Sequence, residues 1–143
     1  RQRQMCIRDR PTPGLVETLG QLRAAGIRCA VGSSGCRANV DFVLDACRIG
    51  DFFEARICGD MVTRCKPDPE IYQTAAAALG LDPAACLVFE DAPAGIEAAR
   101  RAGIGRIVAL ATTLPREQLE KAEGLYRIVT DFRDITNIHQ ILE

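Results

Sequence analysis

Residues 87–95 read LVFEDAPAG, a short apolar run that ends in two adjacent carboxylates and continues into a proline-led segment. The apolar residues predict a buried strand, and Pro93 predicts the first turn of a following helix. Two like charges about 4 Å apart repel by roughly 4 kcal/mol at an effective dielectric near 20. Glu90 and Asp91 therefore predict a positive partner nearby, which is a helix N-terminus, a cation, or both.

Short apolar runs alternate with amphipathic segments on both sides of this stretch. The expected strands cover residues 27–32, 55–59, 86–90 and 106–110, and the expected helices cover residues 15–26, 37–49, 69–80, 94–103 and 115–124, followed by an extended segment at 126–132. This alternation predicts an α/β fold with a doubly wound parallel sheet and helices on both faces. In such sheets, chemistry gathers at the carboxyl ends of the strands.

The composition fits one soluble globular domain and narrows the class of partner. Of 143 residues, 48% are hydrophobic and 26% are charged, and the net charge is -1. The basic residues are scattered, so we expect no binding to nucleic acid or to an anionic membrane, and a small-molecule substrate fits better. No apolar stretch reaches the ~20 residues that span a bilayer, and the N-terminus lacks the apolar core of a signal peptide, so a cytoplasmic location is expected.

The first ten residues, RQRQMCIRDR, differ from the rest of the chain. They are too charged for a buried strand and contain no turn chemistry. We interpret residues 1–10 as a leader that is not part of the folded domain. A cloning or translation artefact would explain it. Residues 11–143 are expected to form the core domain.

The chain contains seven cysteines, an odd number without tight spacing: Cys6, Cys29, Cys36, Cys47, Cys58, Cys65 and Cys86. Most of them are interpreted as small apolar core residues. The spacing of Cys29 and Cys36 is repeated by Cys58 and Cys65, which raises a zinc site as the alternative. Core packing is favoured over zinc because no CxxC pair is present and Cys29 and Cys58 lie within apolar runs.

Two of the predicted strand ends carry polar groups suited to phosphate. Ser33 and Ser34 lie in VGSSG, where glycines allow backbone amides to approach a ligand, so both serines are candidates for binding phosphate oxygens. An ordinary turn with capping serines is the alternative. Lys66 precedes a proline-marked helix start in RCKPDPEIY, which holds it near a helix N-terminus; a solvated surface lysine is the alternative.

The paired acids of the opening stretch complete the set. Capping of the following helix explains one carboxylate, whereas a magnesium ion explains both Glu90 and Asp91, because magnesium favours hard oxygen ligands. Metal binding is favoured once Lys66 and Ser33 are counted. A hydroxyl, an ammonium group and carboxylates together suit phosphoryl transfer.

The order hydroxyl, lysine, acids resembles the haloacid dehalogenase superfamily, in particular its β-phosphoglucomutase-like branch of sugar-phosphate phosphatases and mutases. The resemblance covers about residues 11–139 and is carried by KPDPEIY (66–72) and VFEDAPAGIEAARRAG (88–103), supported by VGSSG (31–35) and PTPGLVETLGQLRAAG (11–26). It implies that Ser33 binds the transferring phosphoryl group and that Lys66 neutralises it. It also implies that Glu90 and Asp91 surround Mg²⁺, whose charge offsets their repulsion.

The sequence departs from this family at its N-terminal side. Such enzymes carry their nucleophile in an Asp-x-Asp-Gly motif near the N-terminus, followed by a helical cap domain, and neither is in this sequence. In the family, the strand that bears this motif lies centrally, between the strands that end in Ser33 and Asp91. We therefore expect a core without its central strand and cap, the C-terminal part of an enzyme that is inactive alone.

The function implied for the full-length parent is magnesium-dependent hydrolysis of a small sugar or polyol phosphate through an aspartyl-phosphate. A β-phosphoglucomutase-type isomerase is the enzymatic alternative. A non-catalytic binding protein is the alternative if the chain truly starts at Arg1. The sequence leaves the particular substrate and the oligomeric state open.

Overall fold

The computed structural model describes residues 11–142, and the expected leader at residues 1–10 lies outside this range. The helices are α2 (Leu15–Ala24), α3 (Arg37–Ala46), α4 (Glu70–Ala78), α5 (Pro93–Arg101), α6 (Arg116–Leu119) and α7 (His139–Leu142). The strands are β1 (Cys29–Gly32), β2 (Phe53–Ile57), β3 (Leu87–Glu90), β4 (Arg106–Leu110) and β5 (Arg127–Val129). Four single-turn 3₁₀ helices join them: η1 (Gly50–Phe52), η2 (Gly59–Met61), η3 (Pro83–Ala85) and η4 (Phe132–Asp134).

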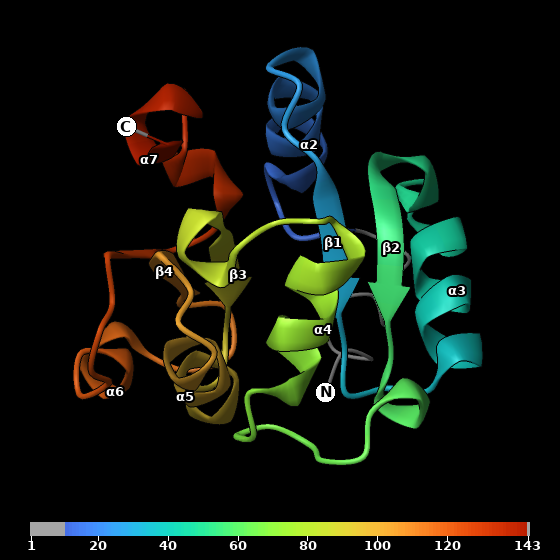
Figure 1. Ribbon diagram of the computed structural model, residues 1–143. Helices are drawn as coiled ribbons and strands as arrows, with labels where there is room; N and C mark the ends of the chain where they lie inside the picture. Colours follow the sequence, from blue (N-terminus) through green and yellow to red (C-terminus); the bar gives the residue numbers. More distant parts are fainter. Residues whose placement is uncertain (1–10, 143) are drawn as a thin grey trace.

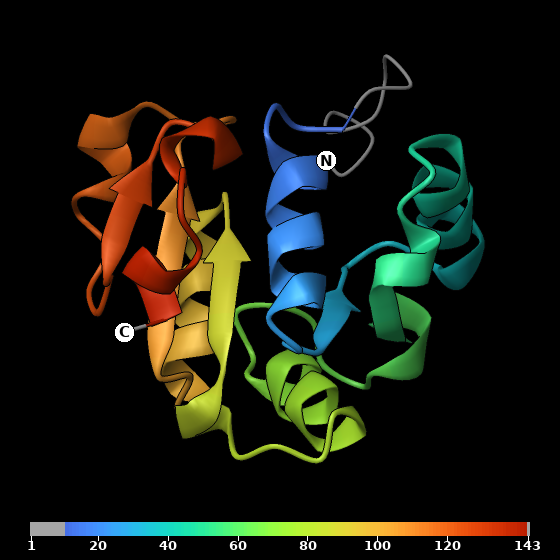
Figure 2. The ribbon, with the colours of Figure 1, turned by 90° about the horizontal axis from the view of Figure 1, so that it is seen from above.

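The strands form two parallel sheets, which confirms the predicted α/β class. β1 pairs with β2, and β3, β4 and β5 pair in that order. Figure 1 shows the two groups of strands side by side, with α4 between them. In Figure 2 the arrows of β1 and β3 point the same way, so the carboxyl ends of both sheets lie at one edge of the molecule.

Helices cover both faces of the strands, as the sequence predicts. Alternate residues of β4 belong to different cores: Val108 packs into a cluster with residues of α2 and α3, whereas Ile107 and Ala109 pack with residues of α4 and α5. This is the two-residue period of a strand that is buried on both faces.

An apolar cavity of about 580 Å³ separates the two sheets. It is lined by β1 and β3, by Leu19 and Leu22 of α2, and by Tyr72, Ala76 and Leu79 of α4 and its end. The family resemblance implies a central strand at this position, and residues 11–142 contain none there. We refer to it below as the inter-sheet slot.

The C-terminal region differs from the prediction. The helix expected over residues 115–124 is limited to α6, and the extended segment expected over 126–132 is limited to β5. Most side chains of residues 120–124 are exposed, so they have no apolar face to bury and a longer helix gains little from packing. α7, which begins at His139, was not expected.

The cysteines only partly follow the core interpretation. Cys47 and Cys58 are buried, whereas Cys36 and Cys65 are exposed. Cys6 lies outside the described residues. Within them, no three His, Cys, Asp or Glu side chains are grouped so as to hold a metal ion. Among the helices of the same range, none is long and apolar enough to cross a membrane.

Candidate active site

Lys66 links the carboxyl ends of the two sheets. Its Nζ lies 2.9 Å from Oε2 of Glu90 at the end of β3 and 3.4 Å from the carbonyl oxygen of Gly32 at the end of β1. The side chains of Lys66 and Glu90 are only 12% and 8% exposed. Lys66 therefore lies between the ends of β1 and β3, and its ammonium group is a positive partner for Glu90.

Glu90 is held by further contacts that the sequence analysis did not identify. The buried hydroxyl of Tyr72 donates a hydrogen bond to Oε2, and the backbone N–H of Asp91 donates to Oε1 at 3.1 Å. Burial, followed by the negative charge of Glu90, raises the pKa of Tyr72 well above its usual value, so the phenol stays a donor. A Cβ atom added at Gly95 would lie 2.0 Å from Cδ of Glu90. Gly95 is thus required for this carboxylate to fold back over the start of α5.

Asp91 has a different environment from its neighbour. It is half-buried, and its Oδ2 accepts a hydrogen bond from Oγ1 of Thr113 at 2.8 Å. No ion pair joins it to a basic side chain among residues 11–142. The two adjacent acids therefore have different partners: Glu90 pairs with Lys66, and Asp91 accepts a hydrogen bond from Thr113.

The two predicted phosphate-binding serines lie in the turn that follows β1. Ser33 is fully buried, and its Oγ accepts a hydrogen bond from the N–H of Gly35 at 3.0 Å, whereas Ser34 is exposed. The turn rests on the end of β2, where the N–H of Gly59 donates to the carbonyl of Gly35 at 2.8 Å. A side chain at Gly59 would collide with the carbonyl oxygen of Ser34 at 2.2 Å. Their binding of phosphate stays a prediction.

The loop that carries Lys66 is fixed by an acid that the sequence analysis also missed. The Glu70 carboxylate accepts from the N–H groups of Thr63 and Arg64 at 2.9 and 2.8 Å. The Glu70 N–H in turn donates to Asp68 at 3.0 Å. The sequence KPDPEIY shows that Glu70 lies in the first turn of a helix. Its hydrogen bonds to the preceding loop could not be predicted, because they depend on how the chain folds back. These bonds anchor the segment before Lys66 to the start of α4.

The donor set fits magnesium through Asp91 rather than through a complete cage. Magnesium is commonly held by one or two carboxylates, with water and substrate phosphate completing its octahedral shell. Asp91 is suited to be such a ligand, because its carboxylate lies at the strand edge beside the hydroxyl of Thr113. Glu90 already accepts from Lys66 and Tyr72. The metal roles of both acids stay predictions.

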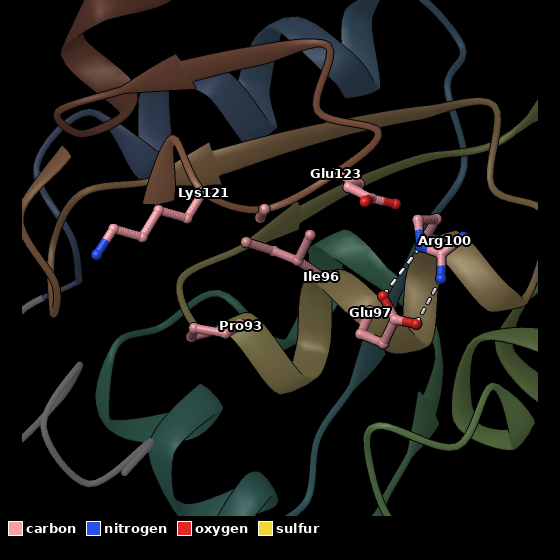
Figure 3. A pocket seen from close by; sticks show the side chains of 7 residues that line it. Pro93, Ile96, Glu97, Arg100, Lys121 and Glu123 are labelled. Carbon is pink, nitrogen blue, oxygen red and sulfur yellow. Dashed lines mark hydrogen bonds and ion pairs between the residues drawn. The ribbon is translucent and has the colours of Figure 1, made fainter. Parts of the chain in front are cut away.

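A second hollow, of about 460 Å³, lies along α5 and is shown in Figure 3. Glu97, which lines it, accepts hydrogen bonds from Arg100 and from Arg101. Those bonds lower the pKa of Glu97 to about 2, so it stays ionised. This hollow brings together no strand-end groups, and we do not consider it the candidate active site.

Comparison with known proteins identifies the family of the chain. Residues 2–103 match the haloacid dehalogenase-like hydrolase family. The chain is 44% identical over 95 residues to protein CbbY of Rhodobacter capsulatus, covering 64% of this chain and 42% of that protein. It is 42% identical over 120 residues to validoxylamine A 7'-phosphate phosphatase of Streptomyces hygroscopicus subsp. limoneus, covering 84% and 56%.

Solved structures agree with the sequence matches. The structure of a putative β-phosphoglucomutase from Thermotoga maritima has a TM-score of 0.83 and 30% identity, covering 94% of this chain and 62% of that one. CbbY from Rhodobacter sphaeroides, in complex with xylulose 1,5-bisphosphate, has a TM-score of 0.82 and 28% identity, covering 91% and 58%. The chain spans about half the length of the two curated relatives named above. It belongs to the haloacid dehalogenase-like hydrolase family.

Proposed function

We propose that these residues form the phosphate-binding core of a magnesium-dependent phosphatase that acts on a small sugar or polyol phosphate. The observation that carries the proposal is the position of the Lys66 ammonium group, held between the ends of β1 and β3 by Gly32 and Glu90. A fixed cation at this edge, beside Ser33 and Asp91, suits a phosphoryl group with several negative oxygens. The phosphatase and the bisphosphate-bound CbbY among the relatives support this substrate class.

In the proposed reaction a carboxylate attacks phosphorus and the bond from phosphorus to the ester oxygen breaks. The leaving alkoxide takes a proton from an acid, and water then hydrolyses the acyl phosphate to release inorganic phosphate. Lys66 and the Ser33 hydroxyl bind phosphoryl oxygens, and Glu90 holds Lys66 in place. Asp91 would hold magnesium, which when bound would supply positive charge to the transferring group.

The attacking carboxylate has to come from a residue outside the motifs described above. No Asp-x-Asp sequence occurs in the chain. In this proposal Glu90 compensates charge and Asp91 helps to hold a cation, and positioning a phosphate without a nucleophile leaves the covalent step undone.

The test is an assay of phosphate release from a panel of sugar phosphates in the presence of Mg²⁺. We expect no significant turnover from the purified 143-residue chain. We expect turnover from a longer protein that joins these residues to an Asp-x-Asp-Gly segment. Robust turnover by the 143-residue chain that is lost in Asp91→Ala would show that a residue within it is the nucleophile, contrary to the proposal.

A mutase is the second candidate, because one of the similar structures is a putative β-phosphoglucomutase. The two activities differ in their products. In the assay of the longer protein, ³¹P NMR of the reaction mixture distinguishes inorganic phosphate, expected from a phosphatase, from an isomeric sugar phosphate, expected from a mutase. Phosphate binding by the longer protein without either product would favour a non-catalytic binding protein.

A further inference from the structure

Tyr72 contacts both members of the buried ion pair at the candidate site. Its hydroxyl donates to Oε2 of Glu90, the same oxygen that Nζ of Lys66 contacts at 2.9 Å. The Nζ atom also lies 5.0 Å from the centre of the Tyr72 ring, within the range of a cation–π interaction. One side chain of α4 therefore acts on the ammonium group through its ring and on the carboxylate through its hydroxyl.

The position of the Tyr72 ring is fixed by its surroundings. Tyr72 is buried in the first turn of α4, which packs against β1. A Cβ atom added at Gly32, the last residue of β1, would lie 3.3 Å from Cε1 of the ring. Burial, and then the negative charge of Glu90, raise the pKa of Tyr72 well above its usual value. The hydroxyl therefore stays protonated and remains a donor to Glu90.

Two donors on one carboxylate oxygen divide its negative charge. Each donor then interacts with that oxygen less strongly than it would alone, and the effect is larger in a buried site because little water screens the charges. Without the Tyr72 hydroxyl, Lys66 would be the remaining donor to Oε2 of Glu90 among residues 11–142. We expect the ammonium–carboxylate pair to tighten in that case, although the fold as a whole loses a hydrogen bond.

The strength of this ion pair decides how available Lys66 is to an anion. A lysine ammonium group has three N–H donors. Within the part of the chain that the structure describes, Nζ has two acceptors, the Gly32 carbonyl at 3.4 Å and Glu90 at 2.9 Å, so one donor is left for a ligand. Glu90 also competes with an incoming anion for the same positive charge. A weaker pair therefore favours anion binding, and a tighter pair opposes it.

We propose that Tyr72 is a positioning residue for phosphate binding: its hydroxyl limits the pull of Glu90 on Lys66 and so keeps the ammonium group available to a phosphoryl oxygen. The inference rests on the proposed function for the identity of the ligand. Tyr72 acts through Glu90 and Lys66 and need not touch the substrate. Phenylalanine at this position would keep the ring and its cation–π contact but would remove the effect of the hydroxyl.

The experiment compares the 143-residue chain with two variants at position 72. Tyr72→Phe removes the donor, whereas site-specific replacement of Tyr72 by 3-fluorotyrosine strengthens it, because fluorine makes the phenol more acidic. NMR measures the rate at which the Lys66 ammonium protons exchange with water and, in a titration, the affinity for inorganic phosphate. The control is Tyr126→Phe: Tyr126 is exposed, and its ring also has a cation beside it, with Cζ of Arg106 4.9 Å from the ring centre.

We expect Tyr72→Phe to slow the exchange of the Lys66 ammonium protons and to weaken phosphate binding by about three- to tenfold, the range for one hydrogen bond. The fluorinated chain should change both quantities in the opposite direction, and Tyr126→Phe should change neither. A purely structural role of Tyr72 predicts the opposite sign for exchange in Tyr72→Phe, because looser packing exposes the ammonium group to water and speeds its exchange.

Faster or unchanged exchange in Tyr72→Phe would overturn the proposal, as would slower exchange with an equal phosphate affinity. If Tyr72→Phe does not fold, the fluorinated chain decides, and unchanged or slower exchange there would overturn the proposal. Failure of the proposed function has a different signature. The two expected changes in exchange, with no phosphate binding by any of the chains, would support the effect of Tyr72 on the ion pair and show that Lys66 is not a phosphate ligand.

Discussion

Substitution of Gly95 by alanine is expected to destabilise the fold, although alanine is normally the better residue inside a helix. Gly95 lies in α5 and is buried against the Glu90 side chain. The added Cβ would lie 2.0 Å from Cδ, 2.1 Å from Oε2 and 2.5 Å from Cγ of Glu90. Because Lys66 and Tyr72 hold this carboxylate, it cannot move aside without giving up both contacts.

The magnitude follows from those contacts. A hydrogen bond to a charged group contributes about 1.5–3 kcal/mol, so loss of the Lys66 and Tyr72 bonds costs up to about 3–6 kcal/mol. Replacing glycine by alanine in a helix returns about 0.5–1 kcal/mol. We expect Gly95→Ala to lower the free energy of unfolding by about 2–5 kcal/mol. Urea denaturation followed by circular dichroism measures this difference.

The matched control is Gly20→Ala in α2. Gly20 is exposed, and a Cβ at that position would meet nothing within 4 Å, so the fold should gain about 0.5–1 kcal/mol. A second comparison repeats Gly95→Ala in a Glu90→Ala background, which lacks the three atoms that the new Cβ meets. There the substitution should no longer destabilise. Equal costs of Gly95→Ala in both backgrounds would refute the steric argument.

Three further outcomes are expected. Tyr72→Phe should lower the free energy of unfolding by about 1–3 kcal/mol, because Glu90 loses a buried hydrogen-bond donor. As a control in the same urea assay, Tyr126→Phe at an exposed site should change it by less than about 0.5 kcal/mol. Arg133 lowers the pKa of Asp131, so that carboxylate stabilises the fold above its unfolded pKa of about 3.9 and loses this effect as pH falls through its lower folded pKa. Asp131→Asn should therefore cost more at pH 7 than at pH 2.5 in urea titrations at the two pH values, and an equal cost would contradict this reasoning. In the longer protein, Asp91→Ala should abolish Mg²⁺-dependent phosphate release with an unchanged circular dichroism spectrum, and unchanged turnover would exclude Asp91 from the mechanism.

Most of the fold could be predicted because it depends on local patterns. The apolar runs that became β1, β3 and β4 are bounded by turn residues, and their neighbours have helical spacing with glycine at the ends. The C-terminal region was predicted less well, because residues 120–124 have good helix composition but no surface on which to pack a longer helix.

The candidate site was predicted in part. The features that were missed are contacts between residues that lie far apart in the sequence. Glu90 could be placed at a strand end, and Lys66 before a helix, because each position follows from a local pattern. The hydroxyl of Tyr72 reaches Glu90 across 18 residues, and the need for glycine at position 95 appears only when α5 folds back over the end of β3. No periodicity in the sequence contains these two contacts.

The acid pair of the opening stretch has a structural consequence for any study of Lys66. Its Nζ contacts Gly32 on one sheet and Glu90 on the other, so the group proposed to bind phosphate also ties the two sheets together beside the inter-sheet slot. Removing one partner of a buried ion pair leaves the other charge uncompensated, at a cost of about 3–5 kcal/mol. A loss of phosphate binding in a Lys66 variant therefore has two physical sources. Only the loss of phosphate affinity that remains when Glu90 is neutralised as well can be assigned to the contact between Lys66 and phosphate.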